Sequence, residues 1–231
     1  VEGISTARWL LAFRKYEMVE RQTVKLIESA HEGRIHCSFN IVGTESGRFS
    51  CKNPNLQQVA AKTSMGMAIR SCFVGDLIVA DFDNVEMRLL AHFSNDPLLL
   101  DSYSPGKDID IHQRTADLLD VDRSTGKTLN FMILYGGGPQ KLAQSLKIDI
   151  EQAKYLLDSW FQTYHYVKEW KDKVIYRANI DGYVTSLSGR RRHVPELKGC
   201  LMYQKRNRDE LRLMYALQRE ACNFVLQGSS A

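Results

Sequence analysis

The stretch RSTGKTLNFMILY, residues 123–135, places the strongest constraint on how this chain folds. Residues four positions apart lie on one face of an α-helix. We therefore predict a helix from about Arg123 to Leu134 with one continuous stripe of functional side chains. Two cations and then two aromatic rings make up this stripe, which we call the ladder: Arg123, Lys127, Phe131 and Tyr135.

The order of the ladder suits a nucleoside triphosphate. Fixed positive charge binds a phosphate tail, and flat rings offer a surface on which a base can stack. The alternative is an ordinary amphipathic helix, with its aromatic rings in the core and its cations in water. The remainder of the sequence has to decide between these interpretations.

Composition sets only broad limits. With 231 residues, 44% of them hydrophobic, the chain can bury a sizeable core. A net charge of +4 is a weak indication of a polyanionic partner, but basic residues gather at 190–193 and 205–212. Such a run can equally be a solvated face. The first residue is Val1, so we expect the natural start upstream.

The cysteines and the hydropathy pattern indicate a cytoplasmic protein, although an organelle is not excluded. Five cysteines are scattered without a CxxC pair, which argues against a disulfide scaffold or zinc knuckle and favours a reducing compartment. No apolar run approaches the roughly 18 residues that span a bilayer, so we expect no membrane association.

Local patterns predict the other elements. Apolar spacing indicates helices at 7–30, from Val85 to about Phe93, at 112–119, at 150–180 with an interruption near His165, and at 209–226. Residues 34–42 alternate as in a strand, 43–55 are expected as a loop, and 182–195 as a hairpin turning at Gly189. The run GGGP at 136–139 is expected to stop the ladder helix, without forming a phosphate loop.

LIVADF, residues 77–82, is a short apolar run of the kind that forms a buried strand. It closes on Asp81, shortly before the helix that begins at Val85. A strand, an acid, a turn and a helix in that order can hold a carboxylate at a sheet edge facing a ligand. The alternative is that Asp81 simply caps the following helix.

Several segments together resemble the polymerase domain of family A DNA polymerases. DFDNVEMRLLAHFSND (81–96) resembles motif A, usually DYSQIELRxLAHLSxD, and RSTGKTLNFMILYGG (123–137) resembles motif B, RxxxKxxNFGxxYG. Further segments match in the family's order: GRIHCSFN (33–40), TESGRFSCKNPNLQQV (44–59), GKDIDIHQRTA (106–116), GYVTSLSGRRRHVP (182–195) and QREACNFVLQG (218–228).

The resemblance implies roles at matched positions. Asp81 matches a ligand of two catalytic Mg²⁺ ions, for which carboxylate oxygens are suitable. Groups that bind the triphosphate match Arg123, Lys127 and His112, and Lys127 is also expected to be catalytic. Rings that line the nucleotide pocket match Phe131 and Tyr135. Glu86 matches the steric gate against a ribose 2′-OH, so dNTPs are the expected substrates. The alternative roles are a helix cap for Asp81, a structural histidine for His112 and a surface acid for Glu86.

The resemblance also implies contacts with primer–template DNA. The matched positions are Arg48, Asn53, Asn55 and Gln57 along the minor groove, and Arg190 and Gln227 near the template and primer terminus. Arg191 and Arg192 are either phosphate contacts or solvated charge. The motifs differ from the family pattern at Asp83, Asn84, Gly126 and Met132. Asp83 either strengthens metal binding or faces away.

The expected fold is α+β, with a partial palm sheet and a mostly helical fingers subdomain in a right-hand polymerase architecture. The expected parts are 1–33 (end of the thumb and connecting helices), 34–95 (palm with motif A), 96–215 (fingers with motif B) and 216–231 (a helix returning to the palm). The second metal-binding aspartate of the family lies in a His-Asp hairpin, motif C, but no His-Asp dipeptide occurs here.

The resemblance thus implies a template-directed DNA polymerase in an incomplete or split form. A second polypeptide or a missing segment is expected to supply motif C. The alternative function is a non-catalytic subunit that binds DNA or nucleotide and assembles with a partner chain.

Overall fold

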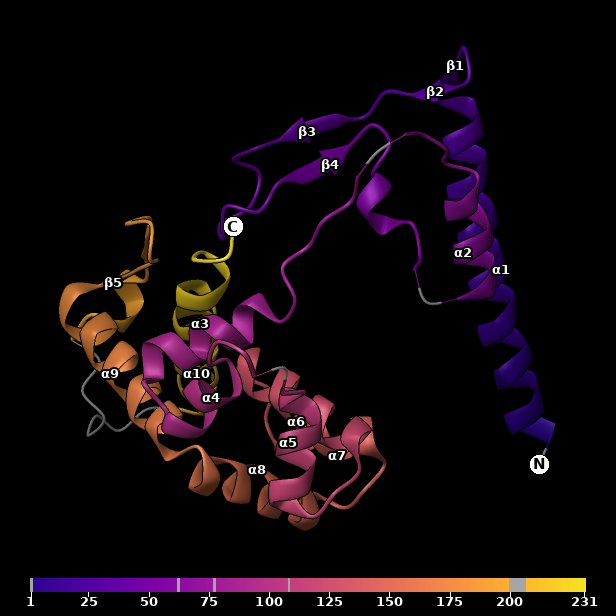
Figure 1. Cartoon of the computed structure of the whole chain (residues 1–231). Coiled ribbons are helices and arrows are strands. Elements are labelled where there is room, and N and C mark those ends of the chain that lie inside the picture. The colour runs from indigo at the N-terminus through magenta and orange to yellow at the C-terminus, as the bar shows by residue number, and fades with distance from the viewer. Residues whose placement is uncertain (1, 62, 77, 108, 200–206) are drawn as a thin grey trace. The chain divides into compact units, whose positions relative to one another are not determined.

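The computed structural model of the chain describes residues 2–61, 63–76, 78–107, 109–199 and 207–231 (Figure 1). The chain divides into two compact units, Val1–Asp81 and Phe82–Ala231. Helices dominate these ranges, and the strands described in them form three separate two-stranded antiparallel sheets. The predicted α+β class is therefore confirmed. The finer division into four parts stays a prediction.

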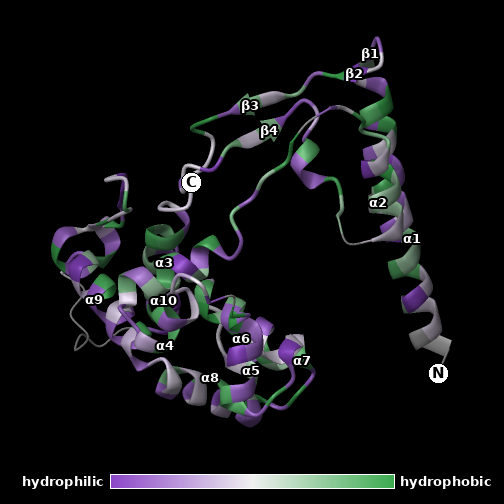
Figure 2. Cartoon of the chain, in the orientation of Figure 1, coloured by the Kyte–Doolittle hydropathy of each residue, from purple (hydrophilic) through white to green (hydrophobic). Residues whose placement is uncertain are grey.

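Unit 1 begins with the predicted helix, α1 (Glu2–Glu28). Hydrophobic and hydrophilic residues are mixed along it (Figure 2), and Val19 and Leu26 are buried. A hairpin follows, with Glu32 and Gly33 both at positive φ, as its two-residue turn requires. The elements after α1 are β1 (Ala30–His31), β2 (Arg34–Ile35), β3 (Ser38–Asn40), β4 (Ser50–Lys52), the 3₁₀-helix η1 (Leu56–Gln58) and α2 (Ser64–Ser71).

The predicted loop at 43–55 is partly wrong, because β4 lies within it. Phe39 of β3 faces Cys51 of β4 in an antiparallel pair. The local excess of Gly, Ser and Asn indicated a loop, but pairing with β3 organises Ser50–Lys52 as a strand. Pairing across a loop is a tertiary effect that composition does not report.

Unit 2 contains eight of the described α-helices and one described hairpin. The helices are α3 (Val85–Ser94), α4 (Pro97–Ser102), α5 (Ile111–Leu119), α6 (Arg123–Leu134), α7 (Pro139–Leu146), α8 (Ile150–Thr163), α9 (His165–Asp181) and α10 (Arg208–Gln227). The strands β5 (Tyr183–Thr185) and β6 (Arg191–His193) are followed by the 3₁₀-helix η2 (Pro195–Leu197). The helices, the break near His165 and the hairpin predicted here are confirmed.

Helix starts in unit 2 are set by local side chains. Four aspartates each accept a hydrogen bond from one or two backbone amides in the first turn of the helix that follows: Asp96, Asp110, Asp122 and Asp149. These amides have no partner inside the helix, and a carboxylate also complements the helix dipole. The chain therefore enters α6 at Arg123, as predicted.

The predicted buried strand at 77–82 is wrong for residues 78–82, the part of the run that the structure describes. These residues form neither helix nor strand, and Ile78 is fully exposed. No described segment pairs with them. Apolar, β-branched composition favours a strand only where a neighbouring strand takes up the backbone hydrogen bonds. Leu77 lies outside the described residues.

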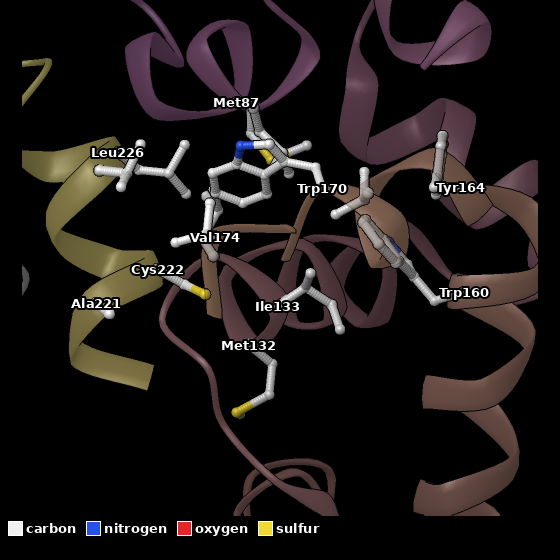
Figure 3. Packing of buried hydrophobic residues seen from close by; sticks show 14 of the residues in the cluster. Met87, Met132, Ile133, Trp160, Tyr164, Trp170, Val174, Ala221, Cys222 and Leu226 are labelled. Atoms are coloured by element: carbon white, nitrogen blue, oxygen red, sulfur yellow. The ribbon is translucent and has the colours of Figure 1, made fainter. Parts of the chain in front are cut away.

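The core of unit 2 is formed by side chains from α3, α6, α9 and α10 (Figure 3). Trp160 of α8 and Tyr164, which directly follows the end of α8, belong to the same core. Met132 and Ile133 reach it from α6, and Trp170 packs near Met87. Burial of these side chains contributes about 1.5–3 kcal/mol each. The core therefore covers the face of α6 that does not carry the ladder.

Two further observations bear on the expectations from composition. None of the described helices is both long and apolar enough to cross a bilayer. In the described ranges Cys37, Cys51, Cys72 and Cys222 are free thiols, and Cys200 lies outside those ranges.

Candidate functional site

The ladder lies on one outward face of α6. The rings of Phe131 and Tyr135 are parallel within 3°, with centroids 6.1 Å apart. Lys127 Nζ lies 5.8 Å from the centre of the Phe131 ring. Arg123, Lys127 and Tyr135 are exposed and Phe131 is partly buried. The four side chains therefore form the predicted stripe on one helix. The alternative holds in part, because Phe131 packs against the core while Tyr135 stays exposed.

Helix α5 packs tightly against α6 because residue 126 is glycine. A Cβ placed on Gly126 would lie 2.6 Å from the His112 carbonyl oxygen and 3.0 Å from the Ala116 backbone nitrogen. Contacts this short are repulsive. Gly126, which departs from the family pattern, therefore allows the first turn of α5 to pack against α6. This close packing places His112 next to α6.

His112 lies beside the ladder, next to Phe131. Its ring centroid lies 5.6 Å from that of Phe131, and the residue is only 4% exposed. Its Nδ1 lies 3.0 Å from Asn130 Nδ2. The sequence places His112 on another helix, and packing brings it to the middle of the ladder.

Trp160 decides which ring nitrogen of His112 carries the proton. Its Nε1–H can only donate, and it donates to Asn130 Oδ1 over 2.8 Å. The amide nitrogen of Asn130 must then face His112 and donate to Nδ1. Nδ1 is therefore an acceptor, so neutral His112 carries its proton on Nε2.

The surroundings keep His112 neutral. Burial lowers the pKa of His112, and the nearby cations Lys127 and Arg123 lower it further, while Asp110 and Asp83 act in the opposite direction. A neutral imidazole with its proton on Nε2 is a hydrogen-bond donor that adds no charge to the site.

Arg123 is held at the start of α6 by a carboxylate from the start of α5. Its Nε donates to Asp110 Oδ2 over 2.6 Å. The other carboxylate oxygen, Oδ1, caps α5 by accepting from the amides of His112 and Gln113. The guanidinium is thus oriented before any ligand arrives.

The other end of the ladder is tied to α3. The Tyr135 hydroxyl donates to Glu86 Oε2 over 3.1 Å. This bond joins the matched residues of motif A and motif B, which are 49 positions apart. Glu86 therefore lies beside the ring end of the ladder.

Two donors secure the last turn of α6. Asn223 Nδ2 of α10 donates to the Tyr135 carbonyl over 3.2 Å, and Lys171 Nζ of α9 donates to the Ile133 carbonyl over 3.0 Å. A cation suits the negative end of a helix. Burial lowers the pKa of Lys171 from its ordinary value.

The assembled site can bind an anionic, ring-bearing ligand. Its cationic end offers Arg123 and Lys127, its middle a neutral donor from His112, and its far end two aromatic rings. Cations and neutral donors suit phosphate oxygens, and exposed rings suit a base.

Asp81 and the ladder helix belong to different units, so their predicted proximity stays a prediction. Asp81 is exposed and is the last residue of unit 1. Within the described ranges no three His, Cys, Asp or Glu side chains come close enough to hold a metal ion. The described residues therefore do not fit a complete site for two Mg²⁺ ions.

Some of the predicted DNA-binding side chains of unit 1 have structural partners. Asn55 caps η1 by accepting from the Gln57 amide over 3.1 Å. Gln57 Nε2 donates to the Phe49 carbonyl over 2.9 Å. Arg48 and Asn53 lie in the same segment, before η1. The structure thus places these residues together along 48–57 and leaves their contact with DNA a prediction.

In unit 2 the predicted residues Arg190 and Gln227 lie in segments that touch. The Leu187 amide in the hairpin turn donates to Ser229 Oγ, just after α10, over 2.8 Å. Of the neighbouring arginines, Arg191 lies 4.7 Å from the centre of the Tyr183 ring. Arg192 pairs with Glu220 at 2.7 Å, so this guanidinium is engaged within the protein.

Three residues that support the site were not singled out from the sequence: Asp110, Asn130 and Trp160. Asn130 gave a usable signal, because it is a polar residue on the apolar face of the predicted helix. The structure shows that it is fully buried, where a polar side chain needs hydrogen-bond partners. Asp110 was part of a quoted motif without an assigned role. Trp160 carried no local signal, because its partner lies 30 residues away.

Several known proteins are similar to this chain. The sequence model described as DNA polymerase family A matches residues 2–231. DNA polymerase I of Thermus filiformis is 36% identical over 212 residues, which cover 86% of this chain and 24% of the relative. DNA polymerase I of Deinococcus radiodurans is 35% identical over 214 residues, covering 87% and 21%. The chain thus spans about a quarter of the length of these relatives.

A solved structure is also similar: the POL domain of Pol1 from M. smegmatis in complex with DNA primer-template and dNTP. It superposes with a TM-score of 0.82 and 33% sequence identity, over 95% of this chain and 40% of the mycobacterial chain. Because the family's sequence model covers nearly every residue and a solved member shares the fold, the chain belongs to DNA polymerase family A.

Proposed function

We propose that this chain is the nucleotide-selecting part of a template-directed DNA polymerase, which adds deoxynucleotides to the 3′-OH of a DNA primer. The ladder carries the proposal, because it combines phosphate-binding charge and stacking rings on one exposed helix face. Family membership supports it. The mycobacterial relative in complex with primer-template DNA and dNTP supports the same class of ligands.

At the cationic end, Arg123 and Lys127 bind the triphosphate, and His112 donates its Nε2–H to a phosphate oxygen. Negative charge moves onto the pyrophosphate leaving group as the α-phosphate is attacked. Donors and cations placed beforehand stabilise that charge without reorganisation. We assign Lys127 to this stabilisation.

At the ring end, Phe131 and Tyr135 line the nucleotide pocket and Glu86 closes it against a ribose 2′-OH. The hydrogen bond from Tyr135 supports this role, because it holds the carboxylate of Glu86 beside the rings. The substrate is therefore a dNTP.

We propose Asp81 as one ligand of the two Mg²⁺ ions that the family implies. Bound metal would supply charge stabilisation at the reacting phosphate. The described residues do not complete such a site, and the sequence contains no His-Asp dipeptide. We propose that a second polypeptide or a further segment supplies the remaining carboxylate.

Primer–template DNA is the proposed macromolecular partner. Arg48, Asn53, Asn55 and Gln57 would follow the minor groove, where acceptors are nearly the same for every base pair. Arg190 and Gln227 would lie near the template and primer terminus. The contact between their segments supports this pairing.

Nucleotide binding is tested with a fluorescent dNTP and the full chain. Lys127→Ala is expected to weaken binding about tenfold or more, because it removes a charged hydrogen-bond donor. Lys141→Ala, an exposed lysine on α7, is the matched control. Equal affinity of the two variants would contradict the proposed role of the ladder.

Catalysis is tested by primer extension with the chain alone and with a polypeptide that carries motif C. Extension only with the partner, abolished by Asp81→Ala, supports a split polymerase. DNA or nucleotide binding without extension under either condition supports the alternative, a non-catalytic binding subunit.

A further inference from the structure

Asp110 uses its two carboxylate oxygens for two different tasks. Oδ1 accepts from the backbone amides of His112 at 2.9 Å and Gln113 at 3.2 Å, which caps α5. Oδ2 accepts from Arg123 Nε at 2.6 Å. One side chain therefore fixes the start of the helix that carries His112 and the direction of the first cation of the ladder.

Asp110 is ionised at neutral pH. Its partial burial would raise the pKa, but the hydrogen bonds from Arg123 and from the Gln113 and His112 amides outweigh that effect, so the pKa lies below its ordinary value. The carboxylate therefore neutralises Arg123.

The pair is open to exchange. The Arg123 side chain is 51% exposed and the Asp110 side chain 41%. Ion pairs this exposed are weak and are screened by salt. A polyphosphate carries several charges and also meets Lys127, so it can outcompete a single carboxylate for the guanidinium. Only one of the five N–H groups of Arg123 is used in the bond to Asp110.

We propose that Asp110 is a latch on Arg123, an internal counter-ion that an incoming polyphosphate must displace. This inference rests on the proposed function, because it assumes that Arg123 binds phosphate. The latch holds the guanidinium beside the ladder when the site is empty. It lowers the affinity for polyphosphates and disfavours anions too weakly charged to replace it.

Asp122 provides a matched control. It caps α6 as Asp110 caps α5, with Oδ1 accepting from the amides of Ser124 at 2.8 Å and Thr125 at 3.1 Å. Its second oxygen accepts from the Thr125 hydroxyl at 2.6 Å. The partners of Asp122 in the described part of the chain are thus neutral groups of its own helix. Asparagine preserves a cap at both positions and removes one negative charge.

The test is calorimetric titration of the full chain with inorganic tripolyphosphate at low salt and neutral pH. Asp110→Asn is expected to bind about 1.5- to fivefold more tightly than Asp122→Asn, the range that an exposed ion pair implies. In an Arg123→Gln background, Asp110→Asn should give no such gain. This second comparison separates release of Arg123 from a general change of charge.

The outcomes are distinct. Equal affinity of Asp110→Asn and Asp122→Asn, a gain that persists without Arg123, or weaker binding by Asp110→Asn would each overturn the latch while leaving nucleotide binding intact. Binding by Asp110→Asn alone would support the latch. No binding by the wild-type chain or by either variant would overturn the proposed function and the latch together.

Discussion

Replacement of Gly126 by alanine tests the close packing of α5 on α6. Helix propensity alone predicts that alanine stabilises a helix interior by about 1 kcal/mol relative to glycine. The structure predicts the opposite sign. The added methyl would lie 2.6 Å from the His112 carbonyl oxygen, 3.0 Å from the Ala116 nitrogen and 3.1 Å from the Ala116 Cβ. Two of these three atoms belong to the backbone.

The magnitude follows from the balance of the two effects. Overpacking costs about 1–3 kcal/mol, so subtracting the propensity gain leaves about 0–2 kcal/mol of net destabilisation. A slight separation of α5 from α6 would relieve part of this cost. That separation would also move His112 away from Phe131.

The assay is urea unfolding followed by tryptophan fluorescence, with the nucleotide affinity measured on the same samples. Gly75→Ala is the control, because nothing lies within 4 Å of a Cβ at that glycine. We expect Gly126→Ala to be less stable than the wild type and to bind nucleotide more weakly, and Gly75→Ala to change neither by much. A gain of about 1 kcal/mol in Gly126→Ala, as propensity predicts, would refute the close approach.

Three further predictions concern residues around the ladder. Burial and nearby cations lower the pKa of His112 in the folded chain, so the unfolded chain binds more protons in acid. The free energy of unfolding should therefore fall as the pH drops below about 6.5, and unfolding measured against pH should show a smaller slope for His112→Gln. Asn130→Ala should lower the free energy of unfolding by about 1–3 kcal/mol, because it leaves the Trp160 indole N–H without its acceptor. Thr128→Ala, on the same helix, is the control, and an equal or larger loss of unfolding free energy in that control would contradict the prediction. Phe131→Tyr, placed in an intact family polymerase, should ease incorporation of dideoxynucleotides; unchanged selectivity in a chain-termination assay would count against the assignment.

The interpretation of residues 77–82 shows where local reasoning failed. The run is apolar and β-branched, yet its described residues are exposed and unpaired with any described segment. The longer helices could be predicted because their hydrogen bonds are internal to the segment. The short helices α2, α4 and α7, of six to eight residues each, were not predicted. A strand needs a neighbouring strand to take up its backbone hydrogen bonds, so strand propensity predicts a strand only where such a neighbour is present.

Sequence by itself determined the ladder. The spacing of four residues put Arg123, Lys127, Phe131 and Tyr135 on one face, because helix periodicity acts within a few residues of the chain. The match to the family motifs likewise needed only the order of residues.

Tertiary structure alone decided which residues surround the ladder and how they bind to it. The proton position on His112, the partner of Arg123 and the need for glycine at 126 all arise where α5 and α8 meet α6. These contacts join residues 10 to 30 positions apart, such as Gly126 with Ala116 and Asn130 with Trp160. No local pattern encodes them, because a hydrogen bond between two helices depends on how the helices pack, and packing is set by the whole core at once.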